Sequence, residues 1–311
     1  MSNNNKITTL PTLQERIAHF SELGDILRKI VAGDGIDNPP PAEFKTLCQK
    51  VTAANPWFDE RNLKFALESI ADMLSDDALN KWLNSYQVHD NQQSIGVIMP
   101  GNIPAAGFHD LLSVILSGNL IKAKLSNEDN VILPFIKEVL TRIDPRYDQV
   151  IIFVERIVDV DAVIATGSNN TFRYFDHYFS KHPHIFRKNR NSVAVLTGSE
   201  NEYDYLLLGR DIFTYYGLGC RNISKLYVPR TFQPDDLFRN IESYSEVMEH
   251  NKYMNNYEYQ RAILVMNEVP FLTNNFLILR EDPSLMSPVS VLNFEYYDDA
   301  VHLEALLDAH K

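Results

Sequence analysis

The segment Val97-Ile98-Met99-Pro100-Gly101-Asn102-Ile103-Pro104 joins an apolar run to a turn that is bounded by two prolines. An apolar run that ends at turn residues is typical of a strand buried on both faces. The prolines restrict the backbone on either side of Asn102. A pre-oriented side-chain amide can donate a hydrogen bond to a developing oxyanion, a contribution of roughly 3 kcal/mol in characterised enzymes. The same pattern also suits an ordinary turn at the end of a strand.

Further short apolar runs occur along the chain at intervals that leave room for a helix. Together with 95–99, these runs are residues 120–125, 150–154, 163–165 and 193–196. Apolar strands that alternate with helices are typical of an α/β protein with a mainly parallel sheet, which binds ligands beyond the carboxyl ends of its strands. The loops after Met99, Leu125 and Ala165 are therefore the first candidates for a site.

The N-terminal part of the chain has a helical pattern instead. Between Leu13 and Ile30 the apolar residues recur at three- and four-residue steps, which places them on one helical face. A second helical stretch covers roughly 63–83, after an interruption that contains glycine and three consecutive prolines. We therefore interpret residues 1–88 as a helical N-terminal region.

A second αβ region is predicted after residue 197. A helical segment is followed there by a glycine-bounded turn around Cys220 and by a strand at 225–228. The chain then divides into a helical N-terminal region, a nucleotide cofactor-binding domain, a catalytic domain with Cys220 and a C-terminal segment. The expected boundaries are 1–88, 89–196, 197–290 and 291–311.

The composition limits the classes of partner and compartment. The formal net charge is -12, whereas nucleic acids and anionic membranes are bound by clusters of Lys and Arg. The two cysteines, Cys48 and Cys220, lack the paired spacing of a zinc or redox motif. No stretch reaches the ~18 apolar residues of a membrane helix, and no signal-peptide core is present. We expect a cytoplasmic protein with free thiols that binds no metal and no nucleic acid and does not insert into membranes.

The first candidate for chemistry is the segment Tyr216-Gly217-Leu218-Gly219-Cys220-Arg221-Asn222. Glycines permit tight backbone geometry and leave room for a substrate. The positive charge of Arg221 favours a thiolate, which is the nucleophilic form of cysteine. A cysteine considered alone is nevertheless more often part of apolar packing, and this is our interpretation of Cys48.

Two further segments have groups suited to a nucleotide. Lys124 and Ser126 lie at the end of a predicted strand, where an ammonium and a hydroxyl suit a ribose or phosphate, although exposed lysines usually face solvent without a ligand. Gly167 and Ser168 stand between a predicted strand and a helix, where backbone N–H groups can bind phosphate. The full G-x-G-x-x-G fingerprint of dinucleotide-binding proteins is absent.

Taken in their order along the chain, the segments with Asn102, Lys124-Ser126, Gly167-Ser168 and Cys220 resemble those of the aldehyde dehydrogenase superfamily. More narrowly, the chain resembles the acyl-CoA reductase branch, which includes the fatty-acid reductases of bacterial bioluminescence, over about residues 90–300. The resemblance implies an aldehyde-dehydrogenase-like α/β fold with a Rossmann-type cofactor domain and an αβ catalytic domain. It implies that Asn102 belongs to the oxyanion hole and that Cys220 is the catalytic nucleophile.

The resemblance also implies a nicotinamide cofactor. Ser287-Pro288-Val289 matches a Gly-Pro-Val segment near the nicotinamide, with serine in place of glycine. The residues that the resemblance places around the adenosine ribose and diphosphate are Pro100, Gly101, Lys124, Ser126, Gly167 and Ser168.

The departures from the superfamily pattern concern its glutamates and one glycine. Hydrolytic aldehyde dehydrogenases have a general-base glutamate about 34 residues before the cysteine, but residues 184–192 here contain no carboxylate. Without a base that activates water, reduction of a thioester is favoured over hydrolysis. Ser284 replaces the glutamate that binds the nicotinamide ribose, and Phe172 replaces the second glycine after the Gly-Ser turn. Members of the superfamily continue beyond Lys311, so we expect either a shortened chain or a compact branch.

The resulting hypothesis is NADPH-dependent reduction of a long-chain acyl thioester, acyl-CoA or acyl carrier protein, to the fatty aldehyde. The cofactor preference rests on the resemblance and on the lysines near the ribose, and NADH remains an alternative. The resemblance further implies a homodimer. Two other hypotheses stay open: acyl transfer or thioester hydrolysis by Cys220 without a nicotinamide, and a non-catalytic acyl-binding relative.

Overall fold

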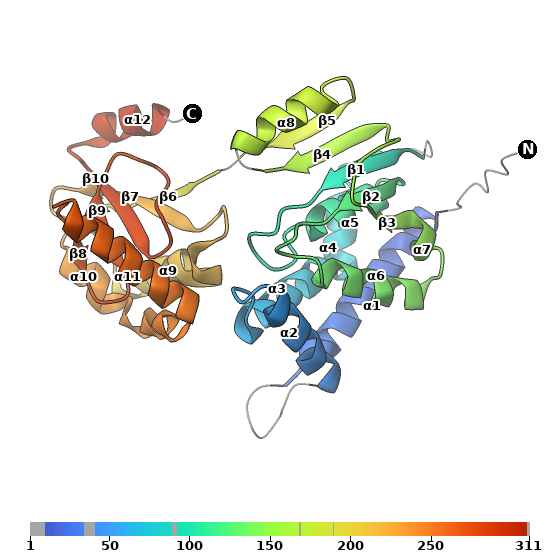
Figure 1. Ribbon diagram of the computed structural model, residues 1–311, viewed down its shortest axis with the longest axis horizontal. Helices are drawn as coiled ribbons and strands as arrows, with labels where there is room; N and C mark the ends of the chain where they lie inside the picture. Colours follow the sequence, from blue (N-terminus) through green and yellow to red (C-terminus); the bar gives the residue numbers. More distant parts are fainter. Residues whose placement is uncertain (1–9, 34–40, 89–91, 168, 189, 310–311) are drawn as a thin grey trace, which may run out of the picture. The chain divides into compact units, whose positions relative to one another are not determined.

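The computed structural model describes residues 10–33, 41–88, 92–167, 169–188 and 190–309 (Figure 1). The chain forms two compact units, Met1–Asn189 and Arg190–Lys311. Of the residues proposed from the sequence, Ser168 lies outside the described residues. None of the helices in the described ranges is long and apolar enough to cross a membrane.

The N-terminal region is helical, as predicted. Its helices are α1 (Leu13–Val31), α2 (Ala42–Ala54), α3 (Glu60–Met73) and α4 (Asp76–Leu83). Helix α1 begins at a capping box in which Thr12 and Glu15 exchange hydrogen bonds with each other's backbone N–H. The stretch predicted at 63–83 is two helices, because the Ser75 hydroxyl accepts the Ala78 N–H and starts a new helix.

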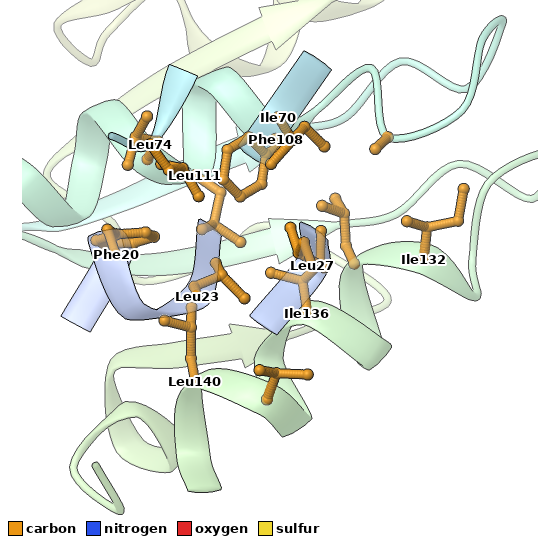
Figure 2. Packing of buried hydrophobic residues seen from close by; sticks show 14 of the residues in the cluster. Phe20, Leu23, Leu27, Ile70, Leu74, Phe108, Leu111, Ile132, Ile136 and Leu140 are labelled. Atoms are coloured by element: carbon orange, nitrogen blue, oxygen red, sulfur yellow. The ribbon is translucent and has the colours of Figure 1, made fainter. Parts of the chain in front are cut away.

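One apolar core holds these helices on the first sheet. Phe20, Leu23 and Leu27 on α1 are completely buried. Figure 2 shows them between Leu111 on one side and Ile136 on the other. Burial of a large apolar side chain contributes about 1.5–3 kcal/mol, so this core attaches the N-terminal helices firmly to the sheet.

The first sheet contains five parallel strands in the order β3-β2-β1-β4-β5. The strands are β1 (Ser94–Ile98), β2 (Leu120–Lys124), β3 (Ile151–Phe153), β4 (Ala162–Thr166) and β5 (His184–Arg187). The connecting helices are α5 (Phe108–Leu116), α6 (Ile132–Ile143), α7 (Tyr147–Val150) and α8 (Asn169–Phe179).

The strand order reverses between β1 and β4. The chain adds β2 and β3 on one side of β1 and then returns to add β4 and β5 on the other side. In Figure 1, α8 covers one face of the sheet at β4 and β5, while α5 and α6 lie against the opposite face. This is a doubly wound sheet, whose ligands bind at the carboxyl ends of the strands where the order reverses.

The second unit has its own sheet, in the order β6-β7-β10-β9-β8. Its strands are β6 (Ser192–Val195), β7 (Ile223–Pro229), β8 (Leu272–Thr273), β9 (Ile278–Glu281) and β10 (Val291–Tyr297). They pair in parallel except for β8. The remaining elements are α9 (Glu202–Phe213), η1 (Thr214–Gly217), α10 (Pro234–Asn240), η2 (Glu242–Glu249), α11 (Asn251–Met266) and α12 (Ala300–Asp308).

Two strands lie in parts of the fold that differ from the boundaries expected from the sequence. The sequence predicts the run at 193–196 within the cofactor domain, but β6 pairs with β7 in the second sheet. It predicts a separate C-terminal segment at 291–311, but β10 is the central strand of that sheet. The pattern of apolar residues predicts that a segment is a buried strand, but it does not predict which strand lies next to it.

Candidate functional site

The candidate cofactor residues of the first unit follow neighbouring strands. Ile98 at the end of β1 pairs with Lys124 on β2 and with Ala165 on β4. Because parallel strands end at the same edge, the turn with Asn102, the loop with Ser126 and the turn at Gly167 all leave this carboxyl edge of the sheet. Lys124 and Asn102 are exposed there, and Ser126 is half-buried. The structure therefore brings these sequence-predicted residues to one edge.

The turn after β1 packs closely on the loop after β2. The Met99 N–H donates to the Lys124 carbonyl at 3.0 Å. A Cβ atom at Gly101 would collide with the side chain of Ser126 and approach the Asp129 nitrogen to 3.2 Å. Glycine is therefore needed at position 101 for close approach of two loops, which is the role that the structure shows for this candidate residue.

Asp129 bonds to the same turn after β1. The sequence does not identify it as a site residue. It is 4% exposed, and its Oδ2 accepts the Ala105 N–H at 2.7 Å. Ala105 has φ of 56°, a conformation that is unfavourable for alanine without such support. Burial raises the pKa of Asp129 to about 6. A single acidic residue in a loop gives no sequence signal that it will be buried.

The turn at Gly167 is joined to the end of β5. The Gly167 N–H donates to the Arg187 carbonyl at 3.2 Å, so this amide is already engaged. Unpaired amides for a phosphate would come from the first turn of α8 instead. The Phe172 ring meets the Phe186 ring edge to face at 5.5 Å, which explains how a large residue fits where glycine was expected.

An ion pair lies where β5 ends. The Arg187 guanidinium contacts Asp110 on α5 at 2.5 Å, and the Asp110 side chain is only 5% exposed. The segment 184–192 contains no carboxylate of its own, and the fold brings one to Arg187 from a different element. This carboxylate is paired and buried, so it is not available to activate water.

The candidate nucleophile lies in the second unit, in a turn between η1 and β7. Cys220 is exposed and its thiol is free. Its carbonyl accepts the Ser192 hydroxyl at 3.3 Å. The other cysteine, Cys48, is half-buried on α2, and burial raises the pKa of its thiol. The two cysteines therefore have different environments, and Cys220 is the more exposed of the two.

The loop after β9 is anchored beside the strand that follows Cys220. The Ser224 hydroxyl donates to the Leu285 carbonyl at 2.7 Å, and the Lys225 ammonium donates to the Asp282 carbonyl at 2.6 Å. Lys225 is completely buried and also pairs with Glu295 at 2.7 Å. The loop that contains Ser287-Pro288-Val289 is therefore held by β7.

The donors at the carboxyl edge of the first sheet fit a dinucleotide. An exposed ammonium at Lys124 and a hydroxyl at Ser126 suit ribose and phosphate oxygens. Across the described ranges, no group of three His, Cys, Asp or Glu side chains could hold a metal ion.

Comparison with known proteins gives matches among solved structures. The NAD-dependent aldehyde dehydrogenase of Sinorhizobium meliloti is 15% identical, with a TM-score of 0.71 over 96% of this chain and 68% of that chain. An oxidoreductase of Marinobacter aquaeolei is 10% identical, with a TM-score of 0.74 over 97% and 72%. Aldehyde dehydrogenase C of Pseudomonas syringae, solved as a mutant with NAD+ and octanal, is 13% identical, with a TM-score of 0.67 over 94% and 69%.

The fold is that of the aldehyde dehydrogenases. The prediction of an α/β, aldehyde-dehydrogenase-like fold with a helical N-terminal region is confirmed. No family model matches the sequence, and no curated protein matches it. In the aldehyde dehydrogenase fold of this chain, the first unit has the doubly wound sheet and the second has the cysteine turn.

Proposed function

We propose that this chain reduces long-chain acyl thioesters, either acyl-CoA or acyl carrier protein, to fatty aldehydes with NADPH. The observation that carries the proposal is an exposed cysteine in an anchored turn of an aldehyde dehydrogenase fold. A second supporting observation is that residues 184–192 contain no carboxylate. Asp110, which reaches that segment from α5, forms an ion pair with Arg187.

In the proposed reaction the Cys220 thiolate attacks the thioester carbonyl carbon. A carbon–sulfur bond forms to Cys220, and the tetrahedral oxyanion then expels the donor thiolate, which leaves an acyl-cysteine. The Asn102 side-chain amide and the Cys220 N–H are the proposed donors to the oxyanion. The donor thiolate leaves with the electron pair of the broken bond, so this first step needs no redox partner.

Lys124, Ser126, Gly167 and Ser168, together with Pro100 and Gly101, are the residues proposed to hold the dinucleotide. A reduced nicotinamide held by these residues would supply the hydride that the acyl carbon needs. The resulting alkoxide re-forms a carbonyl and expels the Cys220 thiolate, so the products are the aldehyde and the regenerated nucleophile. The chain's own contribution is to orient Cys220 and to keep a water-activating base away from the acyl-enzyme.

The choice of cofactor is part of the proposal. A nicotinamide dinucleotide is supported by the matched structures, among them one that holds NAD+. The preference for NADPH is supported by the positive charge of Lys124 at the exposed carboxyl edge. Clearly better turnover with NADH would contradict this preference.

Intact-protein mass spectrometry tests the proposal. Wild type, Cys220→Ala and Cys48→Ala are each mixed with palmitoyl-CoA, with and without NADPH. We expect a palmitoyl adduct on wild type and Cys48→Ala but not on Cys220→Ala, and we expect NADPH to remove it with release of the aldehyde. Cys48→Ala is the matched control because it removes the other thiol of the chain.

The remaining outcomes separate the alternatives. An adduct that NADPH does not discharge would indicate acyl transfer or thioester hydrolysis by Cys220. Binding of palmitoyl-CoA without any adduct would indicate an acyl-binding protein. An adduct on Cys220→Ala but not on Cys48→Ala would place the reactive thiol at Cys48.

A further inference from the structure

We propose that Asn222 is a positioning residue that presents Cys220 and its backbone N–H for acyl transfer. This inference rests on the proposed nucleophilic role of Cys220. Asn222 lies two residues after the cysteine, immediately before β7, and is 9% exposed. No sequence motif distinguishes it from the many surface asparagines of the chain.

The side chain of Asn222 bonds to four points of the backbone, and the longest of these bonds runs from its Nδ2 to the Ile212 carbonyl at 3.5 Å. Its Oδ1 accepts the Gly219 N–H at 2.8 Å. Its Nδ2 donates to the Asp211 carbonyl at 2.8 Å and to the Thr214 carbonyl at 2.9 Å. The carbonyl of Asp211 is in the last turn of α9, where helix carbonyls lack intrahelical donors. One buried amide therefore attaches the cysteine turn to the end of this helix.

The segment that Asn222 spans is conformationally strained. Tyr215 and Tyr216 have φ of 52° and 57°, a left-handed conformation that is unfavourable for residues other than glycine. The Tyr216 ring packs on His250 at 4.4 Å, and Gly217 continues in the left-handed region at φ of 77°. Such strain persists only where surrounding contacts maintain it, and Asn222 bonds to the backbone on both sides of this segment.

The backbone of Asn222 fixes the direction of the Cys220 N–H. The Asn222 N–H donates to the Gly219 carbonyl at 3.0 Å. The Gly219 carbonyl and the Cys220 N–H belong to one planar trans peptide, in which they point in opposite directions. The Cys220 carbonyl is held by Ser192. Both peptides that flank Cys220 are therefore anchored, while its thiol stays exposed.

Two reactions of the same thiol distinguish positioning from simple exposure. Acylation by p-nitrophenyl acetate passes through an oxyanion and depends on oriented donors. Alkylation by iodoacetamide displaces iodide at a saturated carbon and forms no oxyanion. A residue that orients the Cys220 N–H should therefore affect acylation much more than alkylation. Neither reagent requires a nicotinamide or a long acyl chain.

Asn293 provides a matched control in the same unit. It is completely buried, and its Nδ2 donates to the Ser284 and Met286 carbonyls at 2.9 and 3.2 Å. Its side chain thus has the same chemistry as that of Asn222, but it holds a different loop. Asn293→Ala should lower the melting temperature without changing the ratio of acylation to alkylation rates at Cys220.

The experiment measures the nitrophenolate burst and the rate of iodoacetamide labelling at Cys220 in the full chain. For Asn222→Ala we expect the burst rate to fall ~10- to 100-fold and the labelling rate to change less than about threefold. If Asn222→Ala does not fold, Asn222→Asp keeps the side-chain volume and an acceptor for the Gly219 N–H, and a loss in the same direction is expected.

If a folded Asn222 variant has the same ratio of acylation to alkylation rates at Cys220 as wild type, the inference is overturned and the proposed function is unaffected. An equal fall of the ratio in Asn293→Ala also overturns it, because any loosening of the unit would then be sufficient. A wild type without a Cys220-dependent burst overturns both the inference and the nucleophilic role of Cys220.

Discussion

At the scale of single residues, the fold changes the acidity of Asp129 next to the turn that contains Asn102. Burial raises its pKa from an ordinary value of 3.8 to about 6, although its Oδ2 accepts the Ala105 N–H. Its Oδ1 is buried and has no hydrogen-bond partner within the described residues. The carboxyl group thus supports the turn, although its ionised form is unfavourable in the protein interior.

This environment predicts how stability depends on pH. The folded pKa lies above the unfolded one, so the folded chain retains a proton that the unfolded chain loses between about pH 4 and 6. Stability therefore falls as pH rises through this window, and Asp129→Asn, which cannot ionise, escapes the fall. We expect the stability of Asp129→Asn relative to wild type to increase by about 1.5 kcal/mol from pH 5 to pH 7.5 in urea unfolding.

Glu15→Gln is the control for this prediction. The Arg146 guanidinium beside Glu15 lowers the pKa of that carboxyl to about 2, so it is ionised in the folded chain and mostly ionised in the unfolded chain over the same pH range. The difference in stability between Glu15→Gln and wild type should change little between pH 5 and pH 7.5. A constant difference for Asp129→Asn as well would mean that Asp129 is ionised in the folded chain already at pH 5.

At the scale of elements, α9 carries the cysteine turn and packs on η2 through a glycine. A Cβ atom at Gly209 would lie 2.5 Å from Cε2 of Tyr244 and 3.2 Å from Ile241. The Tyr244 ring cannot move easily, because it stacks on Phe213 at 5.3 Å and its hydroxyl donates to the Leu206 carbonyl at 2.8 Å. The contact between the two elements therefore requires glycine.

Gly209→Ala should destabilise the chain despite the better helix propensity of alanine. Overpacking costs typically 1–3 kcal/mol, which exceeds the ~1 kcal/mol gained from replacing glycine within a helix. We expect a lower midpoint in urea unfolding. In a Tyr244→Ala background, the same change should be neutral or stabilising because the added methyl group then has space. If Gly209→Ala lowered the stability equally in the wild-type and Tyr244→Ala backgrounds, the contact with Tyr244 would not be the cause of the destabilisation.

At the scale of the whole molecule, the chain consists of two compact units. Lys124 at the carboxyl edge lies in the first unit, and Cys220 lies in the second. Each unit has its own sheet and its own buried residues. A ligand that binds only the folded chain stabilises it by an amount that depends on its affinity, about 2.7 kcal/mol at 100 times the dissociation constant.

NADPH should therefore raise the melting temperature of the wild type, and NADH should raise it less at equal concentration. Lys124→Ala should weaken NADPH binding roughly tenfold through loss of a charge-assisted hydrogen bond. Lys122→Ala is the matched control, because the Lys122 ammonium on the same strand already donates to the Val158 and Asp159 carbonyls. An equal loss of the NADPH effect in both variants would contradict a cofactor role for Lys124.

Much of the architecture follows from local sequence patterns. The apolar runs predicted at 95–99, 120–125 and 163–165 correspond to β1, β2 and β4, and the pattern between Leu13 and Ile30 corresponds to α1. These elements were predictable because the spacing of apolar residues reports which face of a segment is buried. The carboxyl edge followed from the same reasoning, since parallel strands place their following loops together.

The candidate site depends more on contacts between distant residues. Sequence order identified Cys220 as a candidate, but not the anchors Asn222 and Ser192 on either side of its peptides. Arg187 and its partner Asp110 are 77 residues apart. No local pattern reveals such pairs, because the role of a polar side chain depends on burial by residues that are distant in the sequence.

Local patterns of apolar residues predict where the strands and the first helix form, and which loops follow the strands at the proposed cofactor edge. The pairing partners of β6 and β10, and the burial of Asp129 and Asn222, follow only from the folded chain. Strand pairing and desolvation depend on segments far apart in the chain, whereas the spacing of apolar residues involves only near neighbours.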